Sequence, residues 1–367
     1  MSQGFVPPPY PYDRLESSKS KAAKHAGGVV DLSVGTPCDP PLPSVVAALS
    51  GSNAERGYPP SIGSDPFREA ASRWMQRRFD INIAVNDIAA CIGTKEFVAS
   101  TPSYLRLRSP DRSTVLFPAV AYPTYEMGAI LAGCRPVAVP MNAAGGLDLD
   151  AIDPDDARDA LCLWANSPSN PTGALDDLAA IARWGKANDV LVISDECYCE
   201  FTWDSPAQSI LQYGTSGLVS VHSLSKRSNL AGVRVGFYAG DPEIVGYLKE
   251  VRKHAGLMVP GPAQAAAVVA FDDDDHVVVQ RDLYRRRLDM MADVLSTWSG
   301  YRFTPPAGGF YLWAHVGDGW SFADGLAAAG GALISPGDFY GATSSGWARV
   351  AVVQPNDRLA LVAARLR

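Results

Sequence analysis

The chain has 367 residues, 47% of them hydrophobic and 19% charged, and its net charge is -7 at pH 7. This length exceeds one ordinary compact core and favours a large domain with a smaller one. The composition excludes general disorder, and the acidic balance argues against binding of a nucleic-acid backbone, so we expect no nucleic-acid partner.

Targeting and metal-binding signals are weak. The N-terminal stretch MSQGFVPPPYPYDRL contains no apolar core flanked by basic residues, and no apolar run approaches membrane-spanning length. We therefore expect a cytoplasmic protein with no membrane partner. The six cysteines are scattered, and the C-x-C pair at 197–199 has no second ligand pair nearby, so we expect reduced thiols and no metal site.

The first elements in chain order are an arm and a helix. Residues 1–45 are rich in proline and glycine, which predicts an extended arm and a short strand within GVVDLSVGTP. The spacing of apolar residues predicts a helix over 64–79.

Short apolar runs then alternate with amphipathic stretches. This alternation predicts helices packed on a largely parallel sheet, whose strands are STVLFPA, RPVAVPM, ALCLWAN, DVLVISDE, GLVSVHS and VRVGFYAG. From about residue 265 a long helical pattern and three further apolar runs predict a separate α+β unit. We expect a large domain over 46–264 and a small domain made of 1–45 and 265–367.

Polar residues stand directly after three of the predicted strands. Asn166 ends one run, Asp195 ends the next, and Ser223 with Lys226 follows the third. Ligands of open parallel sheets bind where the carboxyl ends of the strands gather. A lysine that can hold pyridoxal phosphate as a Schiff base, with an aspartate for the ring nitrogen and a cup for the phosphate, would explain this set. The alternative is a lysine that is simply solvated in a loop.

The motifs resemble a known family. NSPSNPTG, SDECYCEF and SLSKRSNLAGVRVGF, in this order, look like the fold-type I aminotransferases of class I/II. The resemblance covers nearly the whole chain through VGTP, GYPPSIGSDPFREA, GTKEF, AYPTYEMG, PPAGGFYLW, SPGDFYG and RVAVV. It implies an α/β fold with a mostly parallel mixed sheet sandwiched by helices and a smaller α+β domain. It also implies pyridoxal 5′-phosphate as cofactor, amino-acid and 2-oxo-acid substrates, and a homodimer with shared active sites.

The resemblance assigns the catalytic roles. Lys226 would hold the cofactor covalently and then move the proton at the substrate α-carbon, which requires a pKa below the ordinary lysine value. Asp195 would pair with the ring nitrogen. Tyr198 and Asn170 would hydrogen-bond the ring oxygen from two sides.

Other cofactor contacts follow from the same resemblance. Backbone amides of Thr94 and Lys95 open a predicted helix whose N-terminus favours the phosphate. Ser223, Arg234 and Ser225 would complete the phosphate cup.

Two tyrosines would contact the cofactor from outside the phosphate cup. Tyr122 would stack on the cofactor ring. Tyr125, three residues later, is the alternative for this stacking role. Tyr58 would reach the phosphate of the neighbouring subunit.

The substrate end is less fully specified. Arg349 would clamp the α-carboxylate, helped by the Gly35 backbone and by Asn170. Within the family the chain is most similar to N-succinyldiaminopimelate aminotransferases, through LSKRSNLAGVRVGFYAGD, KHAGLMVPGPAQAAAV and VDLSVGTPCDP. This implies N-succinyl-LL-2,6-diaminopimelate exchanging its amino group with glutamate and 2-oxoglutarate, in lysine and diaminopimelate biosynthesis. Arg227 and Lys253 are candidates for binding the distal carboxylates, although either could be a surface charge or a structural ion-pair partner.

Besides this substrate, we consider other aminotransferase substrates, a lyase and a non-catalytic regulator. The chain could act on acetylornithine or aspartate, or it could be a β-C–S lyase with the same cofactor. A cofactor-binding regulator would need an added DNA-binding module upstream, and no such module fits before VGTP.

Overall fold

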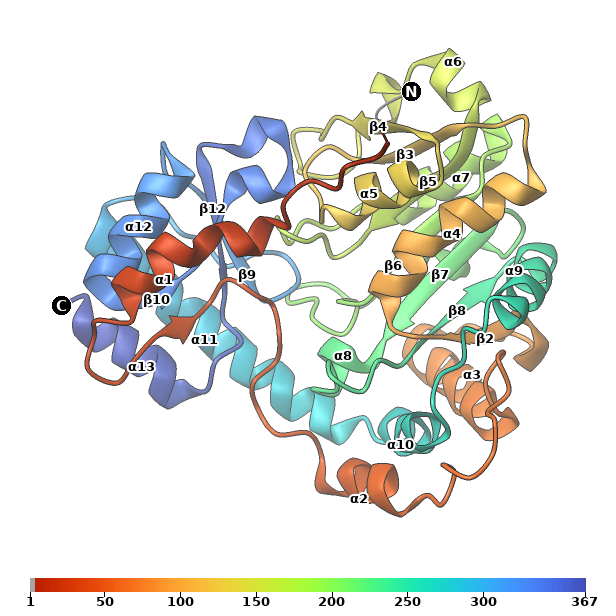
Figure 1. Cartoon of the computed structure of the whole chain (residues 1–367), viewed down its shortest axis with the longest axis horizontal. Coiled ribbons are helices and arrows are strands. Elements are labelled where there is room, and N and C mark those ends of the chain that lie inside the picture. The colour runs from red at the N-terminus through yellow and green to blue at the C-terminus, as the bar shows by residue number, and fades with distance from the viewer. Residues whose placement is uncertain (1–3) are drawn as a thin grey trace.

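The larger part of the molecule is built on one seven-stranded sheet, seen on the right of Figure 1. The computed structural model describes residues 4–367. The strand order is β2-β8-β7-β6-β5-β3-β4, and β8 alone runs antiparallel to its neighbours. The bounds are β2 Ile88–Cys91, β3 Thr114–Pro118, β4 Arg135–Val139, β5 Ala160–Asn166, β6 Val192–Asp195, β7 Leu218–Ser223 and β8 Gly236–Gly240.

Helices cover both faces of this sheet. One face packs against α4 (Thr94–Arg108), α5 (Thr124–Leu131) and α9 (Pro242–His254). The other face packs against α3 (Asp65–Phe79), α7 (Leu178–Asn188) and α10 (Gly261–Phe271). Every residue of β5 is buried, which explains its continuous apolar run, since a central parallel strand has no solvent face. The predicted mixed, mostly parallel sheet between helical layers is confirmed.

The smaller part holds a three-stranded antiparallel sheet in the order β11-β12-β9. A short parallel pair, β1 with β10, joins the N-terminal segment to it. The bounds are β1 Val30–Asp31, β9 Tyr311–His315, β10 Ala332–Leu333, β11 Ser335–Pro336, β12 Trp347–Ala351, α1 Glu16–Ala22, α11 Asp275–Ser299, α12 Gly319–Gly330 and α13 Asn356–Arg365. Gly300 caps the C-terminus of α11, and its φ of +74° suits glycine.

We propose a small revision of the predicted domain boundary. The predicted division at 264/265 falls inside α10, and buried residues of α10 through Phe271 belong to the same core cluster as Phe67 and Trp74. α2 (Pro43–Gly51) packs on α10 as well. We propose that the second boundary lies between Phe271 and the start of α11 at Asp275.

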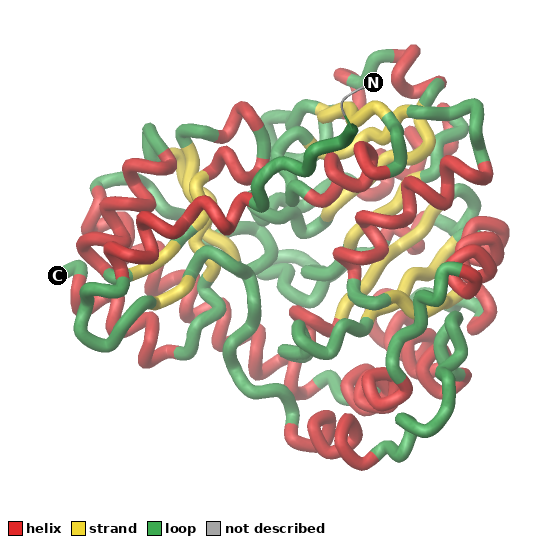
Figure 2. The backbone as a smooth tube through the Cα atoms, in the orientation of Figure 1, coloured by secondary structure: helices red, strands yellow, loops and turns green. Residues whose placement is uncertain are grey.

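The N-terminal arm crosses between the two parts. It runs without regular structure to a 3-10 turn, Pro11–Leu15, and then enters α1, which packs on α12 (Figure 2). Along residues 4–367 we find no helix that is both long and apolar enough to span a membrane.

Candidate active site

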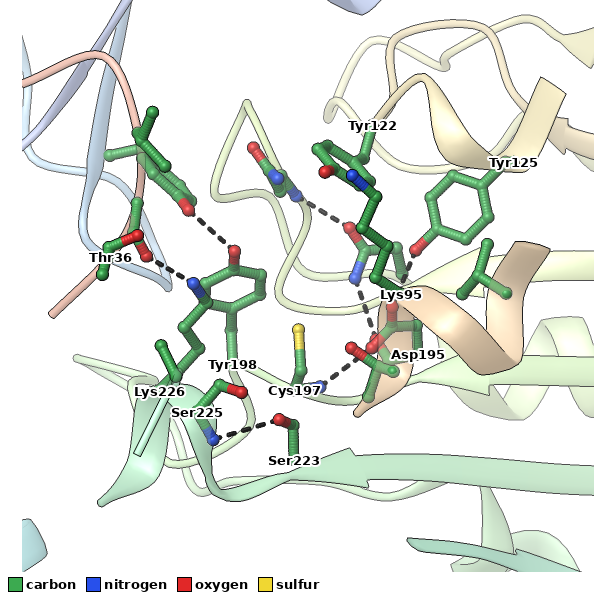
Figure 3. Close-up of a pocket in the computed structure, with 18 of the residues that line it drawn as sticks. Thr36, Lys95, Tyr122, Tyr125, Asp195, Cys197, Tyr198, Ser223, Ser225 and Lys226 are labelled. Atoms are coloured by element: carbon green, nitrogen blue, oxygen red, sulfur yellow. Dashed lines mark hydrogen bonds between the residues drawn. The ribbon is translucent and has the colours of Figure 1, made fainter. Parts of the chain in front are cut away.

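A cavity of about 440 Å³ lies at the carboxyl ends of β5, β6 and β7, between the two parts of the molecule. This volume suits a small cofactor with its substrate. Twelve of the thirteen residues predicted from the sequence line it: Gly35, Thr94, Lys95, Tyr122, Asn170, Asp195, Tyr198, Ser223, Ser225, Lys226, Arg234 and Arg349. Figure 3 shows several of them pointing into one space. Their individual roles stay predictions.

Lys226 lies on the short helix α8 (Leu224–Arg227), whose N-cap is Ser223. Its Nζ donates a hydrogen bond to the carbonyl oxygen of Gly35. Burial lowers the pKa of Lys226 to about 8, and the positive charges of Arg349 and Arg234 act in the same direction. At pH 7 about one-tenth of such a lysine is a neutral amine, far more than at the ordinary pKa of 10.5, and the neutral amine is the form that a nucleophile or base requires.

Gly35 is fixed by close packing. A Cβ at this position would lie 1.9 Å from the Tyr311 hydroxyl oxygen. The carbonyl that receives Lys226 therefore comes from a site where the neighbouring tyrosine leaves no room for a side chain.

Asp195 ends β6, and both of its carboxylate oxygens accept hydrogen bonds. The backbone N–H of Cys197 donates to Oδ1 at 3.2 Å, and the Tyr125 hydroxyl donates to Oδ2 at 3.1 Å. Burial raises the pKa of Asp195, while hydrogen bonds from Cys197 and Tyr125 and the charge of Lys226 oppose the rise. A positively charged ring nitrogen placed beside this carboxylate would favour its ionised form.

A second hydrogen-bonded group lies across the cavity. The hydroxyls of Tyr198 and Tyr311 are 2.7 Å apart. Asn166 donates from Nδ2 to the backbone carbonyl of Asp195, and its Oδ1 accepts from the N–H of Asn170. The two bonds of Asn166 join the end of β5 to the end of β6 and to the loop that carries Asn170.

The opposite end of the cavity is suited to an anion. α4 spans fifteen residues and begins at Thr94, with Gly93 before it at φ +75°. A Cβ on Gly93 would lie 2.3 Å from Arg234 Nη2, so glycine allows the arginine to approach the helix N-terminus. Arg234 itself has a left-handed backbone (φ +59°), which is costly for a residue with a side chain and is found mainly at functional sites. Free helix N–H groups beside a guanidinium favour phosphate.

Arg349 on β12 is 1% exposed. Nη1 donates to Asn170 Oδ1 at 2.7 Å, Nη2 donates to the Ser33 carbonyl, and Nε has no partner among the described residues. The guanidinium carbon lies 4.2 Å from the Tyr311 ring centroid and 4.7 Å from that of Tyr340. A buried cation of this kind can bind a carboxylate that enters the cavity.

Lys95 lies at the outer edge of the cavity. Its Nζ donates to the Tyr10 hydroxyl at 2.9 Å and is 4.6 Å from the centroid of that ring. Tyr122 completes this group, since its hydroxyl lies 3.3 Å from that of Tyr10. Tyr122 and Tyr125 thus both reach the cavity, but only Tyr125 contacts Asp195.

The thirteenth predicted residue, Tyr58, and the two candidates for a distal carboxylate lie elsewhere. Tyr58 is 97% exposed and is not part of the cavity lining. Arg227 and Lys253, the two candidates for a distal carboxylate, do not line it either. Arg227 is buried in a pair with Glu200 at 3.1 Å, and Lys253 is a solvated side chain 3.8 Å from Glu250. Arg227 points away because it closes a structural ion-pair network beneath α8.

Sequence reasoning placed Asn166 at a strand end without giving it a role, and it missed eight other cavity residues, namely Tyr10, Tyr12, Val34, Thr36, Val98, Cys197, Ala231 and Tyr311. Thr36, Cys197 and Tyr311 stand inside or beside motifs already singled out, so proximity along the chain could have found them. Tyr10 and Tyr12 come from the arm, where no local pattern indicates a site.

Together these residues fit pyridoxal phosphate. The cavity offers an amine on Lys226, a carboxylate on Asp195 and, at Thr94 and Arg234, an anion-binding end. These are the three groups that hold this cofactor in its enzymes.

Comparison with known proteins places this geometry in context. Residues 27–366 match the model of the family "Aminotransferase class I and II". A 4-dedimethylamino-4-oxo-anhydrotetracycline transaminase of Streptomyces rimosus is 38% identical over 98% of this chain and 99% of its own. An LL-diaminopimelate aminotransferase of Aquifex aeolicus is 34% identical over 99% of this chain and 97% of its own. The solved structure of a probable N-succinyldiaminopimelate aminotransferase of Thermus thermophilus superposes with a TM-score of 0.86 at 28% identity, covering 97% of this chain and 98% of that one.

Proposed function

The chain belongs to the pyridoxal-phosphate-dependent class I and II aminotransferases, and we propose that it exchanges the amino group of N-succinyl-LL-2,6-diaminopimelate with glutamate and 2-oxoglutarate. Relatives that carry the names LL-diaminopimelate aminotransferase and N-succinyldiaminopimelate aminotransferase support a diaminopimelate-type substrate. The choice between the free and the succinylated form depends on the charges around the cavity.

The charges of the cavity lining carry the proposal. Within residues 4–367 the lining holds four cations, Lys95, Lys226, Arg234 and Arg349, and one carboxylate, Asp195. Three of the cations and the carboxylate have roles in holding the cofactor or an α-carboxylate. Lys95 is left for a second anionic group.

Free LL-diaminopimelate carries a distal ammonium beside its distal carboxylate. With Asp195 committed to the ring nitrogen, the described lining has no further carboxylate to pair with that ammonium. N-succinylation removes this positive charge and adds another carboxylate, which matches Lys95. The succinylated substrate therefore suits the lining better than the free diamine.

The proposed division of labour follows from the contacts. The cofactor, when bound, supplies an electron sink for the negative charge that develops at the substrate α-carbon. Arg349 binds the α-carboxylate and so fixes the α-carbon near Lys226. Lys226 Nζ removes the proton from the α-carbon of the amino donor, and in the second half-reaction it returns a proton to the α-carbon of the amino acid that forms. Its lowered pKa favours both transfers.

We also propose a homodimer in which Tyr58 completes the site of the partner subunit. Its side chain is 97% exposed and is therefore accessible to a partner subunit. A mixture of two inactive variants, Lys226→Ala and Tyr58→Ala, tests this. Exchanged subunits would form one site with Lys226 and Tyr58 both intact, so activity should return on mixing; no return would contradict the shared site.

The substrate assignment is tested by a panel of amino donors with 2-oxoglutarate as acceptor. We expect the highest kcat/KM with N-succinyl-LL-diaminopimelate, and lower values with LL-diaminopimelate, acetylornithine and aspartate. Including a 4-amino-anhydrotetracycline covers the chemistry of the Streptomyces relative. A C–S lyase would instead release pyruvate and ammonia from a cysteine-type substrate without consuming 2-oxoglutarate.

A further inference from the structure

The N-terminal arm is held firmly on the smaller part just before it reaches the cavity. Arg14 pairs with Asp338 at 2.9 Å, and its guanidinium carbon lies 4.9 Å from the Trp320 ring centroid. Leu15 is buried in a cluster with Phe339. The backbone immediately before Arg14 therefore has a defined position at the mouth of the cavity.

Tyr12 enters the cavity from this anchored segment. Its ring packs edge-on against Phe339, with ring centroids 5.5 Å apart. Its hydroxyl accepts a hydrogen bond from Arg349 Nη2 at 3.3 Å and lies 3.2 Å from the Tyr340 hydroxyl. Among residues 4–15, Tyr12 is thus the residue that hydrogen-bonds the buried guanidinium.

The hydrogen bonds of Arg349 show what a carboxylate must do there. A carboxylate binds a guanidinium bidentately along either of two edges, Nε with Nη2 or Nη1 with Nη2. Both edges use Nη2, whose two hydrogens are directed to the Ser33 carbonyl and the Tyr12 hydroxyl. A carboxylate bound along the edge whose Nη2 hydrogen is directed to Tyr12 therefore lies directly beside the Tyr12 hydroxyl.

We propose that Tyr12 is a substrate-binding residue, whose hydroxyl donates a hydrogen bond to the substrate α-carboxylate held by Arg349. A phenol can make this exchange because it both accepts and donates. Before binding, its oxygen accepts from Nη2. With substrate present, Nη2 turns to the carboxylate, and the phenol hydrogen is directed to the same carboxylate oxygen. Only hydrogen bonds are exchanged in this step, and no covalent bond is formed or broken.

Arg14 is then a positioning residue for Tyr12. It touches neither the cavity nor Arg349, but its contacts with Asp338 and Trp320 fix the turn that carries Tyr12. A second arm pair, Lys21 with Asp324 at 2.6 Å, lies on α1 further along the chain. It offers a matched control, because it also holds the arm but lies nine residues beyond Tyr12.

The inference rests on the proposed role of Arg349 and is independent of what binds at Lys95. The test uses the holoenzyme and L-alanine, which has only an α-carboxylate, together with propionate as a competitive inhibitor. In Tyr12→Phe we expect KM for alanine and the inhibition constant of propionate to rise about tenfold, with kcat changed less than twofold. The dissociation constant of pyridoxal phosphate should stay the same. Arg14→Met should shift the two substrate constants in the same direction by a smaller factor, and Lys21→Met should shift neither.

If KM for alanine and the inhibition constant of propionate are unchanged in Tyr12→Phe, the inference is overturned. A decrease in both constants would overturn it as well. A fall would mean that the hydroxyl competes with the carboxylate for Nη2. Arg349→Lys, measured in parallel, separates this failure from failure of the proposed function. If Arg349→Lys also leaves both constants unchanged, Arg349 is not the α-carboxylate site.

Discussion

The Tyr125 hydroxyl donates a hydrogen bond to Oδ2 of Asp195 at 3.1 Å, in a setting where both side chains are buried. Tyr125 comes from α5 and Asp195 from the end of β6, seventy residues apart in sequence. The Cys197 N–H donates to the other carboxylate oxygen, Oδ1. The two hydrogen bonds together hold the carboxylate in one orientation. The carboxylate can therefore meet a ring nitrogen without rearranging.

Tyr125→Phe should weaken cofactor binding. The change removes a hydrogen bond to a carboxylate, and such a bond contributes about 1.5–3 kcal/mol, so the dissociation constant of pyridoxal phosphate should rise about tenfold or more. Titration of the cofactor-free protein, followed by absorbance, measures it. Tyr122→Phe is the control, because the Tyr122 hydroxyl contacts Tyr10 and not Asp195. Equal effects of the two variants would show that the bond to Asp195 has no special role.

Lys95→Met should raise KM for substrates with a second carboxylate by about two- to fivefold, the range expected for a solvent-accessible ion pair. L-glutamate and N-succinyl-LL-diaminopimelate should both show the rise, whereas alanine should not, because it has no distal anion. Lys253→Met provides a control at a cation outside the cavity. A rise for alanine equal to that for glutamate would argue that Lys95 acts on the cofactor or the fold.

The pKa of Lys226 sets a pH dependence. Its value of about 8 lies below the ordinary 10.5 because burial disfavours the charged form. The neutral amine therefore becomes the major form above pH 8. Covalent capture of pyridoxal phosphate by the cofactor-free protein should accelerate through a midpoint near pH 8 and slow about tenfold per unit below it.

Arg349→Met removes a nearby positive charge that contributes to this lowering, so the midpoint should move to higher pH. A midpoint near 10.5 in the unaltered protein would contradict the environment described for Lys226.

Arg227→Met should destabilise the fold without altering substrate selection. Arg227 is buried against Glu200 and also pairs with Asp274 at 2.8 Å. Its removal takes away one cationic partner of Glu200, while Arg78 remains paired with that carboxylate at 2.6 Å. The free energy of unfolding should fall by about 1–3 kcal/mol, measured by urea denaturation. KM for glutamate should not change. A selective rise in KM at unaltered stability would restore Arg227 as a substrate contact.

Much of the sheet and the floor of the site could be predicted from the sequence. Strands such as β5 and β6 are buried on both faces and therefore appear as uninterrupted apolar runs, and the polar residues that follow them gather at one edge. This is why Asn166, Asp195 and Lys226 could be brought together without a structure. β2 was missed because its four residues, IAAC, are too short and too small to stand out from a helical pattern.

The outer part of the site could not be predicted, for a physical reason. Tyr12 meets Arg349 across 337 positions of sequence, through the packing of an irregular arm that has no periodicity. The cation at the cavity edge also differs from the candidate named from the sequence. Arg227 is adjacent to Lys226 in sequence, but the helical turn directs its side chain into the core. Lys95 instead reaches the edge, because it follows the N-terminus of α4 that lines the anion-binding end.

The most direct test of the central claim is a single-turnover absorbance measurement on the holoenzyme mixed separately with N-succinyl-LL-diaminopimelate, LL-diaminopimelate and L-glutamate. The account predicts that the band of the bound cofactor converts to that of the pyridoxamine form with the succinylated substrate and with glutamate, that 2-oxoglutarate reverses both, and that LL-diaminopimelate reacts far more slowly. Equal or faster conversion with LL-diaminopimelate would contradict the substrate assignment drawn from the charges of the cavity.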